Sequence, residues 1–171
     1  MLETSALQPH PQRLAAAGSW LTSYFYVHGE EIRATHEACP VTSSVLKSCL
    51  PLGPSGQVFF SILSGGAHIR PHCGPSNTRL TCHLGLVVPD GAAIRVGTET
   101  VGWREGKCLV FDDSFEHEVW NRSDARRIVL LVQFWHPDLT PEEIWALKEL
   151  GRIGGSTKYK RAVRRGERIE D

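Results

Sequence analysis

The sequence predicts a mainly β fold of the jelly-roll type, and three observations predict it. From Gln57 onward, short runs of β-branched and aromatic residues are separated by Gly, Pro, Asn and Asp. Such evenly spaced runs are typical of an antiparallel sandwich or barrel. Turn sequences such as Pro89-Asp90-Gly91 lie between the runs. The length of 171 residues fits one domain with a continuous core.

We expect a strand in each of these runs and in one aromatic segment nearer the N-terminus. The expected strands are residues 20–27, 58–63, 80–88, 94–96, 109–111, 118–120 and 128–135. They would form a double-stranded β-helix, the cupin-like form of the jelly roll, with short flanking α-helices.

Helices are expected on both sides of the strand region. Two short helices should precede it, the second starting at Pro40, because proline suits the first helical position. After the last strand, Thr140, Pro141 and Glu143 combine an N-cap, a first-turn proline and the acid of a capping box. A helix should therefore start there and run through about the residue before Gly151, which would end it.

The chain divides into three expected parts. Residues 1–15 are interpreted as a loosely attached leader or a short helix, and residues 16–156 as a single jelly-roll domain. Residues 157–171 are locally basic and are interpreted as a solvated or partly disordered tail.

Composition excludes several classes of partner. The formal net charge of +0 gives no electrostatic reason to expect nucleic acid. Five cysteines without paired spacing argue against a secreted disulfide framework and for a reducing compartment. No apolar stretch approaches the roughly 20 residues that span a bilayer. We therefore expect a soluble, cytoplasmic chain; a membrane-anchored parent in the secretory pathway and the oligomeric state stay open.

Two histidines and an arginine are the candidate functional residues. His72 and His117 are 45 positions apart, so they would come from different strands and meet at the barrel mouth. Two neutral imidazoles suit iron, zinc, copper or nickel, although either histidine alone could equally be an ordinary core or surface residue. Arg127 starts a very apolar strand, where a cation is costly unless it meets an anion. The alternative is an exposed flanking arginine like Arg126.

Several neighbouring residues keep two interpretations each. Asp112 and Asp113 could orient His117 or cap the turn before it. His68 is expected to support the loop rather than line the site. The triplet starting at Asn121 fits a glycosylation acceptor, which matters only in the secretory pathway.

Residues 61–141 resemble the aspartyl/asparaginyl β-hydroxylase family of Fe(II)- and 2-oxoglutarate-dependent dioxygenases. The most specific matching string runs from Phe111 to Trp120. The other matches are Gly66 to His72, Gly74-Pro75-Ser76-Asn77, Arg79-Leu80, His83-Leu84-Gly85-Leu86, Trp103-x-Glu105-Gly106-Lys107 and Trp135-His136-Pro137.

The resemblance implies a set of roles for this chain. His72 and His117 would be the iron ligands, and Arg127 would hold the distal carboxylate of 2-oxoglutarate. Trp20, Ser61, Thr81 and His83 match further positions that contact this co-substrate in the family. With O2, the implied reaction hydroxylates the β-carbon of an aspartyl or asparaginyl side chain in a peptide or protein.

Two positions depart from the pattern of 2-oxoglutarate oxygenases. Gly74 stands where most of them carry an iron-binding carboxylate, but the family resembled also lacks it. Thr81 stands where typical members carry an arginine, a loss worth about 1.5 to 3 kcal/mol of co-substrate binding unless Arg70 or Arg79 compensates. Two alternatives therefore stay open: a catalytically weak or inactive binding module that retains the metal site, and a cupin-type metalloenzyme that uses no 2-oxo acid.

Overall fold

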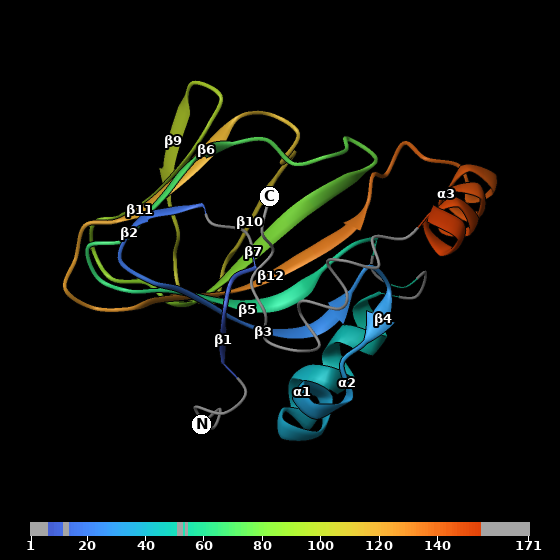
Figure 1. The fold of residues 1–171 in the computed structure, drawn as a ribbon, viewed down its shortest axis with the longest axis horizontal. Coiled ribbons are helices and arrows are strands. Elements are labelled where there is room, and N and C mark those ends of the chain that lie inside the picture. Colours follow the sequence, from blue (N-terminus) through green and yellow to red (C-terminus); the bar gives the residue numbers. More distant parts are fainter. Residues whose placement is uncertain (1–6, 12–13, 51–52, 54, 155–171) are drawn as a thin grey trace.

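Two antiparallel sheets face each other and enclose the core (Figure 1). The computed structural model describes residues 7–11, 14–50, 53 and 55–154. The larger sheet has the order β1-β3-β5-β12-β7-β10, with β4 beside β3. Its strands are β1 (Gln8–Pro9), β3 (Trp20–Val27), β4 (Glu30–Glu31), β5 (Val58–Leu63), β7 (Arg79–Val87), β10 (Cys108–Phe111) and β12 (Arg127–Trp135).

The smaller sheet has the order β2-β6-β11-β8-β9. Its strands are β2 (Ala15–Ala17), β6 (His68–His72), β8 (Ala92–Val96), β9 (Glu99–Gly102) and β11 (His117–Asn121). From β5 to β12 the chain alternates between the two sheets, apart from the β8–β9 hairpin. As a result, β12 lies between β5 and β7, and β11 lies between β6 and β8. This interleaving is the double-stranded β-helix of a jelly roll, and it confirms the expected fold class.

The three expected helices are present, and the two with a predicted start begin there, but the last one ends later than predicted. Helices α1 (Arg33–Ala38) and α2 (Pro40–Cys49) precede β5, with Pro40 in the first turn of α2. Helix α3 (Pro141–Gly154) starts with the expected capping box. In it, Thr140 N–H donates to Glu143 Oε2 at 2.8 Å, and Glu143 N–H donates to Thr140 Oγ1 at 3.3 Å. The predicted stop at Gly151 is wrong, because this glycine keeps the helical conformation instead of the left-handed one that ends a helix.

The N-terminal segment is paired with the barrel over the part that the structure describes. The expectation of a short helix is wrong, since Ala15–Ala17 pairs with β6 and Gln8–Pro9 pairs with β3. His10 is buried and its ring stacks on Trp20, with 3.5 Å between centroids. The expected basic tail, residues 157–171, lies outside the described residues.

The two faces of the larger sheet have different partners. Side chains from both sheets form one core between them, including Leu63, Ile69, Ile94, Val119 and Val129. On the outer face, a second cluster joins α2 to the sheet through Leu46 and Phe25, Val58, Phe60 and Leu130. The helices α1 and α2 thus cover the outer face near β3. Helix α3 lies beyond the end of β12, at the right of Figure 1.

Inward-facing side chains form successive rows across β5, β12 and β7. Val129 lies opposite Ser61 on one side and Gly85 on the other. The next row holds Phe59, Leu131 and His83, and the following one Gln57, Gln133 and Thr81. Because side chains alternate along a strand, Arg127 also points inward, one row before Val129.

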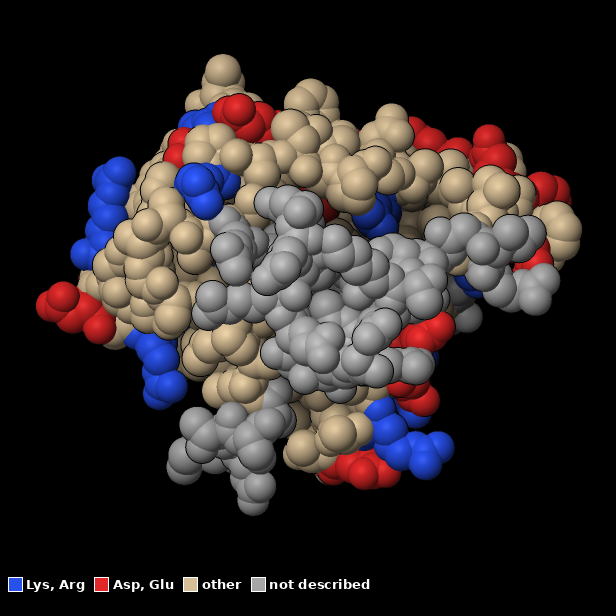
Figure 2. Space-filling view, in the orientation of Figure 1, with Lys and Arg blue, Asp and Glu red and all other residues tan. Residues whose placement is uncertain are grey.

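Charged side chains of both signs lie beside one another around the outline of the face in Figure 2. None of the helices in the described residues is long and apolar enough to cross a membrane.

Asn121 closes the turn that leads from β11 into Arg127. Its side chain is 1% exposed and donates to the carbonyl oxygens of Leu63, Ser64 and Ala125 at 3.3, 3.1 and 2.7 Å. Its Oδ1 accepts from the Ser123 hydroxyl at 2.7 Å. The Asn121 side-chain nitrogen is buried and hydrogen-bonded in the fold, so it is not accessible for glycosylation.

We expect Asn121→Ala to lower the free energy of unfolding by about 2 to 3 kcal/mol, because it removes the buried amide that donates to the carbonyl oxygens of Leu63, Ser64 and Ala125. Urea denaturation measures this change, and Glu99→Ala on the exposed strand β9 is the control. An Asn121→Ala protein as stable as the control would contradict the structural role of this turn.

Candidate active site

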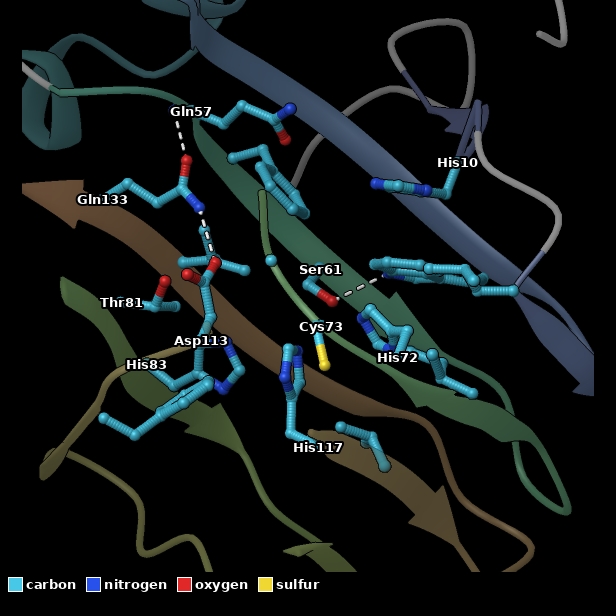
Figure 3. Close-up of a pocket in the computed structure, with 18 of the residues that line it drawn as sticks. His10, Gln57, Ser61, His72, Cys73, Thr81, His83, Asp113, His117 and Gln133 are labelled. Carbon is cyan, nitrogen blue, oxygen red and sulfur yellow. Dashed lines mark hydrogen bonds between the residues drawn. The ribbon is translucent and has the colours of Figure 1, made fainter. Parts of the chain in front are cut away.

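A cavity of about 460 Å³ opens between the two sheets. Strands of both sheets line it, and Figure 3 shows polar side chains converging on it from several directions. The cavity brings together every site residue predicted from the sequence: Trp20, Ser61, His72, Thr81, His83, His117 and Arg127.

The two histidines face each other across the ladder between β6 and β11. They are register partners, and their ring centroids are 4.2 Å apart. His72 Nδ1 lies 2.7 Å from the Arg70 carbonyl oxygen, and His117 Nδ1 lies 3.0 Å from that of Phe115. Because a carbonyl only accepts, Nδ1 carries a proton in both rings, so the neutral form of either ring has its free lone pair on Nε2. Burial, and then the neighbouring His117, lower the pKa of His72, which keeps that ring neutral.

The donor set fits a metal held by two imidazoles rather than a complete protein cage. Among the described residues, no group of three or more His, Cys, Asp or Glu side chains is arranged to hold a metal ion. The two Nε2 lone pairs nevertheless point from one ladder into a cavity, with backbone carbonyls fixing the tautomers. Such backbone contacts are the usual support of metal-binding histidines.

Arg127 is the largest fully buried side chain in the described part of the protein. Its guanidinium donates to Ser61 Oγ at 3.2 Å and lies 4.9 Å from the Trp103 ring centroid. Within the described residues no carboxylate pairs with it, and its Nε has no hydrogen-bond partner. Burial lowers the pKa of Arg127 to about 9. A cation in this position is costly unless the cavity receives an anion.

His83 presents a second unused donor to the cavity. The Trp103 indole N–H donates to His83 Nδ1 at 3.3 Å. An indole nitrogen only donates, so Nδ1 is the acceptor and the proton of the neutral ring lies on Nε2. That Nε2 is buried and has no partner in the described part of the chain. Burial, followed by Arg127 and His117, holds the pKa of His83 well below its usual range.

Ser61 links Trp20 to Arg127. Its Oγ accepts from the Trp20 indole N–H at 2.9 Å and from Arg127 at 3.2 Å. Since the oxygen already accepts twice, the hydroxyl hydrogen is left as a donor. Ser61, His83 and Arg127 therefore direct hydrogen-bond donors into the cavity, an arrangement that suits a carboxylate.

Thr81 lies in another part of the cavity from Arg127. It is the register partner of Gln133, six residues further along β12 than Arg127, which is about 20 Å of strand. Its Oγ1 is buried and has no partner among the described residues. Arg79 also lines the cavity, whereas Arg70 is exposed on β6 and does not. Of the two arginines considered as compensation, the structure therefore places Arg79 at the site.

The neighbouring acids have separate roles. Asp112 caps the turn, since its Oδ1 accepts from Ser114 N–H at 2.9 Å. Asp113 is buried and lines the cavity, where its Oδ2 accepts from Gln133 Nε2 at 3.0 Å. His68 lies 2.9 Å from Glu118 Oε2, which fits the supporting role expected for it.

Gln133 and His10 line the cavity but did not enter the predicted site. The sequence could have indicated Gln133, because it is the one polar residue in the apolar run of residues 128–135. It is an even number of residues from Arg127, so both side chains point to the same face of the strand. His10 had none, since its place depends on the pairing of β1 with β3.

We expect Arg127→Met to raise the free energy of unfolding of the ligand-free chain by about 1 to 3 kcal/mol, because it removes a buried cation that has no carboxylate partner. Denaturant titration measures this, with the exposed Arg126→Met as the matched control, which should change stability by less than about 0.5 kcal/mol. Strong destabilisation by Arg127→Met alone would show that the guanidinium serves structure rather than a ligand.

The neutral, buried His83 should make stability depend on pH. Its folded pKa is lowered, so below about pH 6.5 the unfolded chain binds a proton that the folded chain does not. Stability is therefore present above that pH and falls as the pH falls. Between about pH 6.5 and 5.5 we expect His83→Gln to lose about 1 kcal/mol less than the unaltered chain in urea titrations. Equal losses in both proteins would contradict this assignment.

Comparison with known proteins identifies the family of this chain. Residues 2–137 match the family described as Aspartyl/Asparaginyl beta-hydroxylase. The chain is 40% identical over 138 residues to the human aspartyl/asparaginyl beta-hydroxylase and 38% identical over 137 residues to the human aspartate beta-hydroxylase domain-containing protein 2. It is also 40% identical over 136 residues to the ornithine lipid ester-linked acyl 2-hydroxylase of Rhizobium tropici.

These matches cover 79%, 77% and 77% of this chain, but only 18%, 37% and 47% of the three relatives. The chain thus spans less than half the length of each. Among solved structures, one described as a predicted oxalate decarboxylase from Thermotoga maritima aligns with a TM-score of 0.51 at 12% identity. The alignment covers 80% of this chain and 99% of the Thermotoga chain, so the two share a fold. On the match over residues 2–137, this chain belongs to the aspartyl/asparaginyl beta-hydroxylase family.

Proposed function

We propose that this chain is an Fe(II)- and 2-oxoglutarate-dependent dioxygenase that hydroxylates the β-carbon of an aspartyl or asparaginyl residue in a peptide or protein. The observation that carries the proposal is the buried Arg127, which has no carboxylate partner in the described residues and shares one cavity with His72 and His117. A dicarboxylic co-substrate fits both features of the cavity, since one carboxylate can pair with Arg127 and the other end can bind a metal held by the two histidines.

His72 and His117 would hold Fe(II) through their Nε2 atoms. Arg127 would bind the distal carboxylate of 2-oxoglutarate, with the Ser61 hydroxyl and His83 Nε2–H as further donors. Bound iron supplies the redox chemistry, in which 2-oxoglutarate and O2 become succinate and carbon dioxide while one oxygen atom enters a substrate C–H bond. The protein contributes position and electrostatics.

The cavity walls would keep water away from this chemistry. Phe59, Ile69, Val119 and Leu131 line the cavity beside the polar groups. An apolar wall leaves few places for ordered water, and it strengthens the interaction between Arg127 and a bound carboxylate. Trp20 fixes the Ser61 hydroxyl from the side of β3.

The placement of Thr81 bears on the inactive-module alternative. An arginine at this position would lie in the row of Gln133, separated from Ser61 by the row of Phe59 and Leu131. Its absence leaves the Arg127 end of the cavity intact, which supports catalysis over mere binding. Arg79, whose pKa is lowered by burial, is the cation beside Thr81 that could receive an acidic substrate group.

We expect the purified chain to form succinate from 2-oxoglutarate with Fe(II), ascorbate and O2, because its cavity holds donors for both ends of the co-substrate. His117→Ala should reduce turnover by at least about a hundredfold, since one of only two imidazole ligands is lost. His136→Ala, outside the cavity, is the matched control and should retain turnover.

Three contrary outcomes separate the alternatives. Metal binding without any succinate, even with aspartyl and asparaginyl peptides present, would favour the inactive module. Metal-dependent turnover of another compound, insensitive to Arg127→Ala, would favour a cupin-type enzyme without a 2-oxo acid. Succinate coupled to an acyl lipid instead of a peptide would overturn the substrate class, and the Rhizobium relative makes that arm worth including.

A further inference from the structure

We propose that Gln133 is a positioning residue that holds the Asp113 carboxylate toward the histidine pair, so that Asp113 does the work of the acid missing at Gly74. This inference rests on the proposed function, because it concerns the metal that His72 and His117 would hold. The amide of Gln133 donates to the carboxylate of Asp113 (Figure 3). That carboxylate in turn lies against Gly74, where a Cβ would meet it.

The Gln133 amide can point only one way. Its backbone N–H donates to the Gln57 carbonyl at 3.0 Å, and its carbonyl accepts from Ser55 N–H at 3.3 Å. In the side chain, Oε1 accepts from the Gln57 N–H at 2.9 Å. A backbone N–H only donates, so this bond assigns the amide oxygen and turns Nε2 toward Asp113. A Cβ at Gly56 would collide with Oε1, so a glycine there leaves room for this amide.

The amide donates to one carboxylate oxygen of Asp113 and leaves the other open. Gln133 Nε2 lies 3.0 Å from Oδ2, whereas Oδ1 is buried with no partner in the described residues. A buried carboxylate oxygen without a hydrogen-bond partner lowers the stability of the fold, so we expect Oδ1 to interact with a bound ligand.

Asp113 occupies the space of a side chain at position 74. A Cβ built on Gly74 would lie 2.5 Å from Asp113 Oδ1, and Gly74 N–H donates to the Asp113 carbonyl at 2.6 Å. An acid at position 74 and an acid in the observed place of Asp113 therefore exclude each other. Since Asp113 does not complete a three-residue metal cluster, its Oδ1 would act through a metal-bound water.

The neutral row around Gln133 lets this arrangement persist. Thr81 lies opposite Gln133 and carries no charge that could draw the carboxylate away. Arg79 is the nearby cation, and no ion pair within 4.0 Å joins it to Asp113 among the described residues. Arg79 attracts the carboxylate only at longer range, so the one hydrogen bond that sets the direction of the Asp113 side chain comes from Gln133 among the described residues.

A double-mutant cycle tests the assignment with Co(II) as the probe. Calorimetry measures Co(II) affinity, and urea titration of the metal-free proteins measures stability. We expect Asp113→Ala to weaken Co(II) binding about tenfold and Gln133→Met to weaken it about five- to tenfold. On the Asp113→Ala background, Gln133→Met should change affinity by less than about twofold, because a positioning residue acts only through the group it positions. Gln8→Met in β1 is the matched control for the substitution.

The outcomes separate this inference from the proposed function. Co(II) binding by Gln133→Met as tight as in the unaltered chain, or equal weakening on both backgrounds, would overturn the role of Gln133 alone. Loss of stability without loss of Co(II) affinity would show that Gln133 is only structural. An unaltered chain that binds no Co(II), or binds it equally after His117→Ala, would overturn the metal site and this inference with it.

Discussion

The burial of Arg127 is the constraint on which the rest of the site depends. A guanidinium that is 1% exposed needs hydrogen-bond acceptors, an aromatic ring face or a bound ligand around it. Strand β12 places Arg127 where Ser61 is such an acceptor and Trp103 supplies the ring face. The turn closed by Asn121 sets the start of β12, and therefore the parity of every inward side chain that follows. A central strand with partners on both sides holds that register.

The two sheets of the jelly roll supply different groups of side chains to the site. The smaller sheet supplies the histidine pair from adjacent strands, with both rings locked by backbone carbonyls. The larger sheet supplies the buried donors Ser61, His83 and Arg127, arranged in rows by the alternation of β5, β12 and β7. A co-substrate with two ends can bridge the sheets, and rigid strands hold both sets of groups more precisely than loops would.

Local patterns predicted the three helices and the strands β3, β5, β7, β8, β10, β11 and β12, whereas β1, β2, β4, β6 and β9 were not expected. Two further expectations were wrong, one for a local reason and one because of a distant strand partner. The capping box at Thr140 and the proline start of α2 depend on neighbouring residues and are confirmed. The stop at Gly151 failed because glycine permits the left-handed conformation without requiring it. The helix considered near Ala15 failed because pairing with β6, a partner far along the chain, outweighs the helix propensity of alanine.

The sequence by itself determined the fold class, the family and seven of the residues that line the cavity, because strand periodicity and family motifs can be recognised from neighbouring positions. Only the tertiary structure decided that Asp113 fills the space at Gly74, that Gln133 holds it and that Thr81 lies away from Arg127. Those relations join strands far apart in the chain, and they follow from register and packing, which the order of residues does not specify locally.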